Sequence, residues 1–169
     1  MPELEKLRRA LQQEALRLLV RREHSRQELQ QKLLQKLRAF PEAQSLESDI
    51  LDGIIQITLD AIREKRWQSD ERFAQQRVTH RSGRYGNQRL KQELSQRGIS
   101  ADVISEALEN GEDEVVRCRQ VWLKKFGGPA ENHEGMAKQV RFLQYRGFSG
   151  ATIRQVLKSL PDELITEES

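Results

Sequence analysis

The residues best suited to chemistry in this 169-residue chain are basic, and they gather in one segment. Residues 72–97 hold seven arginines and lysines against one carboxylate, Glu93, a net charge of +6, whereas the rest of the chain sums to −3. Tyr85 lies in this segment between Gly83 and Gly86. Clustered guanidinium groups neutralise phosphates, and an aromatic ring in a turn can stack on a base. The segment therefore predicts contact with nucleic acid, with a solvated helix face as the alternative interpretation.

Two further basic groups follow toward the C-terminus. Lys124, Lys125 and Arg146 are expected near helix C-termini, where cations also stabilise the helix dipole without any ligand. We take all three groups as candidate contacts to nucleic acid or to a protein partner. The candidates are Arg77, Arg81, Arg84, Tyr85, Arg89, Lys91 and Arg97, then Lys124 and Lys125, then Lys138, Arg141 and Arg146.

Neither catalysis nor metal binding is predicted from the remaining polar residues. The three histidines, His24, His80 and His133, lie far apart in the sequence, so none forms an i, i+4 pair with another. The single cysteine, Cys118, falls on an apolar helical stripe, which favours a core position over a nucleophile. The sequence contains no phosphate-binding glycine loop and no zinc-protease or esterase motif. We therefore expect a protein that is not an enzyme, with no catalytic residue, no cofactor and no metal.

The composition favours an all-α protein. Charged residues make up 33% of the chain with a net charge of only +3, aromatic residues make up 5%, and there are four prolines. Such balanced charge suits exposed helix faces. One cysteine excludes an internal disulfide. We find no apolar run long enough to cross a bilayer and no signal peptide, because the N-terminal segment is charged and amphipathic, and we expect a cytoplasmic protein.

Apolar residues at three- and four-residue spacing predict nine helices. Ser25 and Glu28 form a capping box at the start of the second helix, and Ser69 caps the fourth. Breakers between helices lie at Phe40-Pro41, Ser82-Gly83, Gly98, Asn110-Gly111 and Gly127-Gly128-Pro129. Most aromatic side chains are expected to pack small helical cores. These are Trp67, Trp122, Phe126, Phe142, Tyr145 and Phe148.

The last two helix pairs are copies of one another at a constant offset of 49 residues. Leu94, Arg97, Gly98, Ile99, Ser100, Ile104 and Leu108 align without a gap on Leu143, Arg146, Gly147, Phe148, Ser149, Ile153 and Leu157. A weaker third copy begins at Leu29 and Leu33, but Leu37 replaces the glycine and an insertion follows.

The copies predict three tandem three-helix repeats that form an elongated, curved helical array. Residues 1–66 hold the N-terminal helix and the first repeat, and residues 67–110 hold the basic second repeat. Residues 111–169 hold the third repeat and an acidic C-terminal end with Asp162, Glu163, Glu167 and Glu168.

Four segments in order along the chain resemble the RecX family of bacterial regulatory proteins. They are HSRQEL from His24, SDERFAQQRV from Ser69, RYGNQRLKQELSQRGIS from Arg84 and FLQYRGFS from Phe142. The resemblance covers residues 15–160, and the departures are Leu37 and the insertion after it.

The resemblance implies a cytoplasmic, non-enzymatic modulator of RecA recombinase that acts in DNA repair, recombination and the SOS response. Its partners would be the RecA filament and single-stranded DNA, with duplex DNA as a further candidate, and no membrane. Family members lodge along the filament groove or stop filament growth, and so lower ATPase, strand exchange and coprotease activity. We expect the free protein to be a monomer.

A second interpretation is a free-standing nucleic-acid-binding protein with helix-turn-helix-like units. One predicted helix offers Gln88, Arg89, Gln92 and Gln96 as base-reading side chains. This interpretation predicts affinity for DNA alone at physiological salt, whereas a RecA regulator must change RecA activity. An enzyme of unknown reaction, the third class, would turn over substrate without RecA or DNA.

Overall fold

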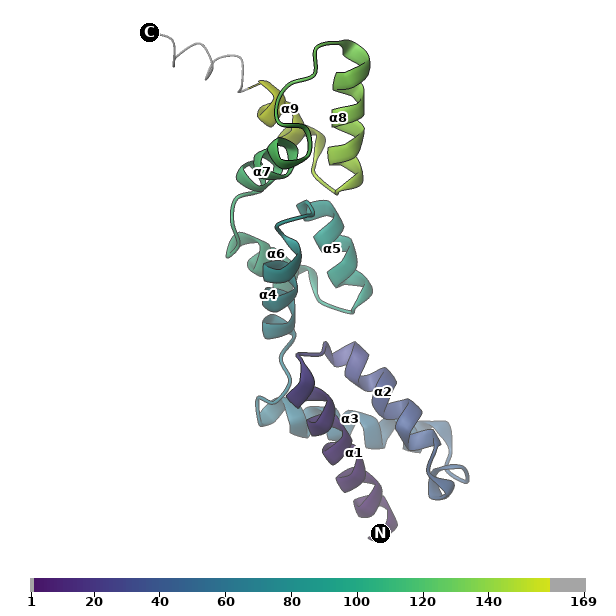
Figure 1. Ribbon diagram of the computed structural model, residues 1–169. Coiled ribbons are helices and arrows are strands. Elements are labelled where there is room, and N and C mark those ends of the chain that lie inside the picture. The colour runs from purple at the N-terminus through teal and green to yellow at the C-terminus, as the bar shows by residue number, and fades with distance from the viewer. Residues whose placement is uncertain (1, 159–169) are drawn as a thin grey trace. The chain divides into compact units, whose positions relative to one another are not determined.

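The computed structural model describes residues 2–158, and every regular element in that range is a helix (Figure 1), which confirms the all-α prediction. The acidic residues Asp162, Glu163, Glu167 and Glu168 lie outside the described residues. The helices are α1 (Pro2–Arg21), α2 (Arg26–Arg38), the short 3-10 helix η1 (Pro41–Ala43), α3 (Ser48–Glu64), α4 (Asp70–Arg81), α5 (Asn87–Gln96), α6 (Ala101–Glu109), α7 (Glu114–Phe126), α8 (His133–Tyr145) and α9 (Gly150–Lys158).

The chain divides into two compact units. Unit 1 consists of Met1–Gln76 and Arg97–Val103, and unit 2 consists of Arg77–Gln96 and Ile104–Ser169. Helices α4 and α6 therefore contribute residues to both units. None of the helices among residues 2–158 combines the length and apolar character that a membrane span requires.

Unit 1 is built on α1, α2 and α3, which pack on one another through leucine and isoleucine side chains. Leu11, Leu29 and Leu33 are fully buried, and each buried leucine contributes about 2 kcal/mol relative to an exposed one. At the start of α2 the Ser25 hydroxyl accepts from the Glu28 backbone N–H, while the Glu28 carboxylate accepts from the Ser25 N–H. This reciprocal pair confirms the predicted capping box.

The chain leaves α2 without a left-handed glycine turn, in agreement with Leu37 in place of glycine. Leu37 is fully buried in α2, and the helix continues to Arg38 with an ordinary right-handed cap at Ala39. Phe40 is extended, as a residue before proline prefers to be, and Pro41 then opens η1. The chain thus leaves α2 through a short 3-10 turn instead of a glycine turn.

The two segments that match at an offset of 49 residues also share a backbone conformation. Gly98 and Gly147 both have left-handed backbones, with φ of 77° and 90°. The serine two residues after each glycine caps the next helix, because Ser100 Oγ accepts from the Val103 N–H at 3.4 Å and Ser149 Oγ accepts from the Thr152 N–H at 3.2 Å. The predicted correspondence between the two segments therefore holds in conformation as well as in residue type.

Helices α7, α8 and α9 enclose one hydrophobic core of unit 2. Its buried members are Cys118, Trp122, Leu143, Phe148, Ile153 and Val156. The Trp122 indole N–H donates to Gln139 Oε1 at 2.9 Å, so this buried ring keeps a polar partner. The core positions predicted for Cys118, Trp122 and Phe148 are confirmed.

Two aromatic side chains do not follow the prediction of core packing. Tyr145 is 77% exposed, because the last turn of α8 buries Leu143 and so presents the residue two positions later to solvent. Trp67 is 36% exposed in the connection after α3, where the Lys65 ammonium lies 4.6 Å from its ring centroid. The core assignment was wrong for both residues.

Candidate nucleic-acid interface

The connection between α4 and α5 in unit 2 carries Arg84 and Tyr85, and Arg117 of α7 holds it in place. The buried Arg117 guanidinium donates to the carbonyl oxygens of Ser82 at 3.0 Å and Tyr85 at 2.7 Å, and also to Asn87 Oδ1. Burial lowers the pKa of Arg117, and the nearby carboxylates of Glu112, Asp113 and Glu114 offset this effect only in part. Arg117 is thus a positioning residue that fixes the backbone of the turn.

Gly86 and Gly147 bring this turn against the turn between α8 and α9. The Gly86 N–H donates to the Arg146 carbonyl oxygen at 2.8 Å, and the Gln88 N–H donates to the Gly147 carbonyl oxygen at 3.1 Å. A Cβ on Gly86 would lie 2.4 Å from the backbone of Gly147, so only glycine permits this approach. The contact brings Tyr85 close to the end of α8.

The ring of Tyr85 is the centre of a cluster of arginines. The guanidinium carbon lies 4.5 Å from the ring centroid for Arg81, 4.1 Å for Arg89 and 5.4 Å for Arg146. Each such cation–π contact is worth about 0.5–1 kcal/mol at a partly exposed site. The half-buried Tyr85 ring therefore mainly holds these three arginine side chains in position.

Glu93, the single acid of residues 72–97, forms ion pairs with three of the arginines. Its carboxylate lies 2.5 Å from Arg81 Nη2, 3.5 Å from Arg89 Nε and 3.9 Å from Arg77 Nε. Burial alone would raise the pKa of Glu93, but the hydrogen bonds from Arg81 and the attraction of all three cations outweigh it and lower the pKa. Glu93 is therefore ionised at neutral pH and reduces the positive charge available at these arginines.

A hollow of about 520 Å³ opens beside this cluster and contains no carboxylate among its lining residues. Four cations line it, together with Phe142, whose ring centroid lies 5.0 Å from the Arg146 guanidinium carbon and 5.7 Å from Lys125 Nζ. Three of the cations are exposed and the fourth is half-buried. They are Arg84, Lys124, Lys125 and Arg146. Such a surface attracts phosphate groups and is not neutralised by acids of its own lining.

The sequence is similar to RecX proteins over nearly its full length. A regulatory protein RecX of Chromobacterium violaceum is 38% identical over 160 residues, which cover 95% of this chain and 97% of the relative. One of Herminiimonas arsenicoxydans is 37% identical, covering 91% of this chain and 95% of the relative. Models of the second and third three-helix domains of RecX match residues 69–108 and 112–157.

The chain belongs to the RecX family. The fold agrees with that assignment, because a crystal structure of RecX from Lactobacillus salivarius has a TM-score of 0.71, at 18% identity, over 93% of this chain and 98% of that one. A second crystal structure of a regulatory protein RecX has a TM-score of 0.70 over 89% of this chain and 72% of that one.

The structure of this RecX family member brings seven of the twelve candidates of the sequence analysis into contact or into one hollow. They are Arg81, Arg84, Tyr85, Arg89, Lys124, Lys125 and Arg146. Arg77 joins them only through its ion pair with Glu93. Lys91, Lys138 and Arg141 are exposed on α5 and α8 but line neither this hollow nor the one beside Tyr145.

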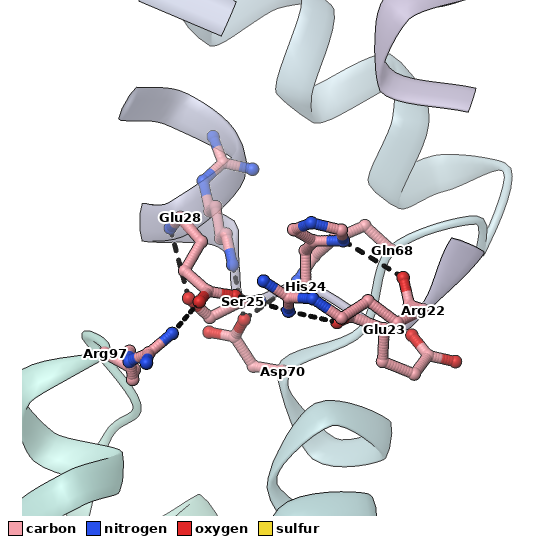
Figure 2. Close-up of polar contacts among 9 residues, drawn as sticks. Arg22, Glu23, His24, Ser25, Glu28, Gln68, Asp70 and Arg97 are labelled. Atoms are coloured by element: carbon pink, nitrogen blue, oxygen red, sulfur yellow. Dashed lines mark hydrogen bonds and ion pairs between the residues drawn. The ribbon is translucent and has the colours of Figure 1, made fainter. Parts of the chain in front are cut away.

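Arg97 lies in unit 1, where it pairs with the buried Glu28 carboxylate (Figure 2). Glu28 also accepts from Arg22 Nη1 at 3.2 Å and from the Ser25 N–H. A neighbouring carboxylate, Asp70, accepts from the Arg26 backbone N–H at 2.8 Å. Arg97 therefore contributes to the polar network of unit 1, and its role as a ligand contact stays a prediction.

Sequence reasoning missed three features of this surface. Arg117 has the spacing of an ordinary helix-surface arginine, so nothing in the pattern marks it as buried. The approach of Gly86 to Gly147 joins residues 61 positions apart and has no local signal, although both glycines are visible in the sequence. Tyr145 was assigned to the core, but its position two residues after Leu143 already indicates the opposite helix face.

The residues from 2 to 158 bring no three His, Cys, Asp or Glu side chains together in a way that could hold a metal ion.

Cys118 is fully buried, and burial raises the pKa of its thiol to about 12. The thiol is therefore protonated and inert at neutral pH. The chemistry this surface offers is attraction of anions and stacking on flat groups.

Proposed function

We propose that this chain is a regulator that binds the RecA filament on single-stranded DNA and lowers its ATPase, strand-exchange and coprotease activities. It acts in the cytoplasm as a monomer, by binding and without catalysing a reaction. Membership of the RecX family, whose relatives are named regulatory proteins, supports the regulatory role. The observation that carries the nucleic-acid contact is the hollow lined by Arg84, Lys124, Lys125 and Arg146 without a carboxylate.

The hollow is suited to the phosphates of a DNA strand held by another protein. Its cations attract phosphates over a distance of about 10 Å at moderate salt, and Arg146 is already oriented by the rings of Tyr85 and Phe142. Arg81 and Arg89 contribute less free charge, because Glu93 neutralises them in part. We therefore assign the main phosphate contacts to the four cations of the hollow, with Arg81 and Arg89 as orienting groups.

A charge-reversal experiment tests this assignment. The double variant R84E/K124E changes two exposed cations of the hollow, and R154E on α9 is the control because Arg154 is exposed and lies outside the hollow. We expect R84E/K124E to weaken binding to RecA filaments on single-stranded DNA by roughly a hundredfold, since each of the two charged contacts is worth about 1.5 kcal/mol. Wild-type binding by R84E/K124E, with an unchanged circular dichroism spectrum, would contradict the assignment.

The second candidate function is a free-standing nucleic-acid-binding protein. It is favoured by the exposed glutamines of α5, Gln88 and Gln92, which lie beside Arg89 in one hollow. This function predicts tight binding to duplex DNA or structured RNA at physiological salt without RecA. Weak duplex binding together with strong filament binding favours the first function.

A further inference from the structure

Tyr145 is a large aromatic side chain that unit 2 leaves in solvent. It is 77% exposed at the end of α8, whereas the other large side chains of the α7–α9 core are buried or half-buried. Its position on α8 directs the ring to solvent, so the unit forgoes the roughly 2 kcal/mol that burial of such a ring would contribute. An exposed tyrosine of this kind is characteristic of a binding surface.

The Tyr145 ring is the outer end of an alternating series of rings and guanidinium groups. The Arg89 guanidinium lies 4.1 Å from the Tyr85 ring centroid and 5.7 Å from the Tyr145 ring centroid. Arg89 is held in this place by Glu93, whose Oε1 lies 3.5 Å from its Nε. One further flat group can extend this series on the exposed ring without disturbing the groups behind it.

A hollow of about 480 Å³ adjoins the exposed ring and differs in chemistry from the cationic one. Its charged lining residues, Arg89 and Glu93, form an ion pair, so the hollow is close to neutral. The remaining polar lining is mostly glutamine. The glutamines are Gln88, Gln92, Gln96 and Gln144, all with exposed side chains.

A neutral hollow with amides and an aromatic ring fits a nucleobase better than a phosphate. A primary amide offers both a donor and an acceptor, so glutamines can pair with the edge of any base. Glu93 would oppose a phosphate at this position, whereas the four cations of the other hollow would attract one. Tyr85 links the two hollows, since its ring contacts Arg146 of one and Arg89 of the other.

We propose that Tyr145 and the glutamine-lined hollow form a stacking site for an unpaired base of a single-stranded nucleic acid. The site rests on the proposed function, because it takes the bases of the strand whose phosphates occupy the cationic hollow. In a duplex, stacking on the neighbouring base pairs covers both faces of each base and pairing occupies its edge, so only an unstacked, unpaired base can stack on Tyr145. The site therefore selects single strands over duplexes and tolerates any sequence.

The test separates bases from phosphates with the full-length protein. Binding is measured by fluorescence anisotropy with labelled oligothymidylate of about 20 nucleotides, longer than common single-strand site sizes, with an abasic strand of equal length and with a duplex of equal length. The variants are Y145A, Y145F and, as a control, V116A, which truncates another exposed apolar side chain of unit 2. Y145F keeps the ring and should bind as wild type does.

We expect wild-type protein to bind oligothymidylate more tightly than the abasic strand. The affinity of Y145A for oligothymidylate should fall by roughly 5- to 100-fold. Affinity for the abasic strand and for the duplex should not change. The inference is overturned if Y145A binds oligothymidylate as tightly as wild type does. It is also overturned if the affinity of Y145F for oligothymidylate falls as much as that of Y145A.

The same titrations with R84E/K124E distinguish failure of this inference from failure of the proposed function. If R84E/K124E weakens binding to every strand while Y145A weakens none, the stacking site is refuted and the phosphate contact stands. If wild-type protein binds none of the strands at low salt, the stacking site and the DNA contact of the proposed function are both refuted. Inhibition of RecA is then tested separately.

Discussion

The Arg117 guanidinium donates a hydrogen bond of 2.7 Å to the carbonyl oxygen of Tyr85, and so joins α7 to the turn that carries the candidate interface. Further bonds from the same group reach the carbonyl oxygens of Ser82 and Glu112, both at 3.0 Å. The turn is thus fixed by one cation whose own side chain is buried. Stability of unit 2 and the geometry of the interface therefore depend on the same residue.

Replacing Arg117 should destabilise the protein strongly. We expect R117M, which keeps most of the side-chain volume, to lower the free energy of unfolding by about 3 kcal/mol, because the part-buried hydrogen bonds to the carbonyl groups of Ser82, Tyr85 and Glu112 are lost. The control V116A changes an exposed neighbour on α7 and should stay within about 0.5 kcal/mol of wild type. Urea denaturation followed by circular dichroism measures both values. Equal stability of R117M and wild type would refute the positioning role.

Gly86 and Gly83 offer a matched pair for the contact between the two turns. A Cβ at Gly86 would lie 2.4 Å from backbone atoms of Gly147 and Phe148, whereas a Cβ at Gly83 would meet nothing within 4 Å. We expect G86A to cost about 2 kcal/mol or more of stability, and G83A to cost less than about 0.5 kcal/mol. Thermal unfolding of the two variants checks this difference. Similar melting temperatures for both would contradict the close approach.

Glu93 should stabilise the fold and weaken DNA binding at the same time. E93Q removes the negative charge beside Arg77, Arg81 and Arg89, so we expect a loss of about 1 kcal/mol in stability at pH 7 and tighter binding to single-stranded DNA. E106Q, at an exposed glutamate of α6, serves as the control. Weaker DNA binding by E93Q would show that the ion pairs matter more for geometry than for charge.

The stability difference between wild type and E93Q should depend on pH in a definite direction. The pKa of Glu93 lies below its ordinary value of 4.5 in the folded protein. Its contribution to stability is therefore complete above pH 4.5 and is lost as the pH falls through the lowered value. The difference in unfolding free energy between wild type and E93Q should shrink in that acidic range. A difference that grows on acidification would contradict the assignment.

Cys118 should be unreactive in the folded protein. Its thiol is fully buried and its pKa is raised to about 12, so roughly one molecule in ten thousand carries a thiolate at pH 8. Ellman's reagent should leave the native chain unmodified and react with one thiol per chain in denaturant. Full modification of the native protein, with its circular dichroism spectrum unchanged, would refute the core position.

Features that depend on residues near one another in the sequence were predictable. The capping box of Ser25 and Glu28 and the equivalent turns at Gly98 and Gly147 follow from local backbone preferences, which the sequence pattern expresses directly. The basic character of residues 72–97 was predictable for the same reason. Composition and charge need no knowledge of the fold.

Features that depend on distant pairing were not predictable. Glu28 lies 69 positions from Arg97 in the sequence, and the contact between them places Arg97, a predicted contact residue, in the polar network of unit 1. Arg117 reaches Tyr85 across 32 positions, and no helical pattern distinguishes a buried arginine from an exposed one. A single sequence records which residues are charged, but tertiary packing decides which charges remain free.

The most direct test of the central proposal is the DNA-dependent ATPase of RecA from the same organism, titrated with this protein on single-stranded DNA at increasing salt. We expect wild-type protein and R154E to inhibit below one molecule per RecA, R84E/K124E to require much higher concentrations, and inhibition to weaken as salt rises. Absence of inhibition by the folded wild-type protein at any salt concentration, together with tight binding to DNA alone, would contradict the proposed regulation of RecA.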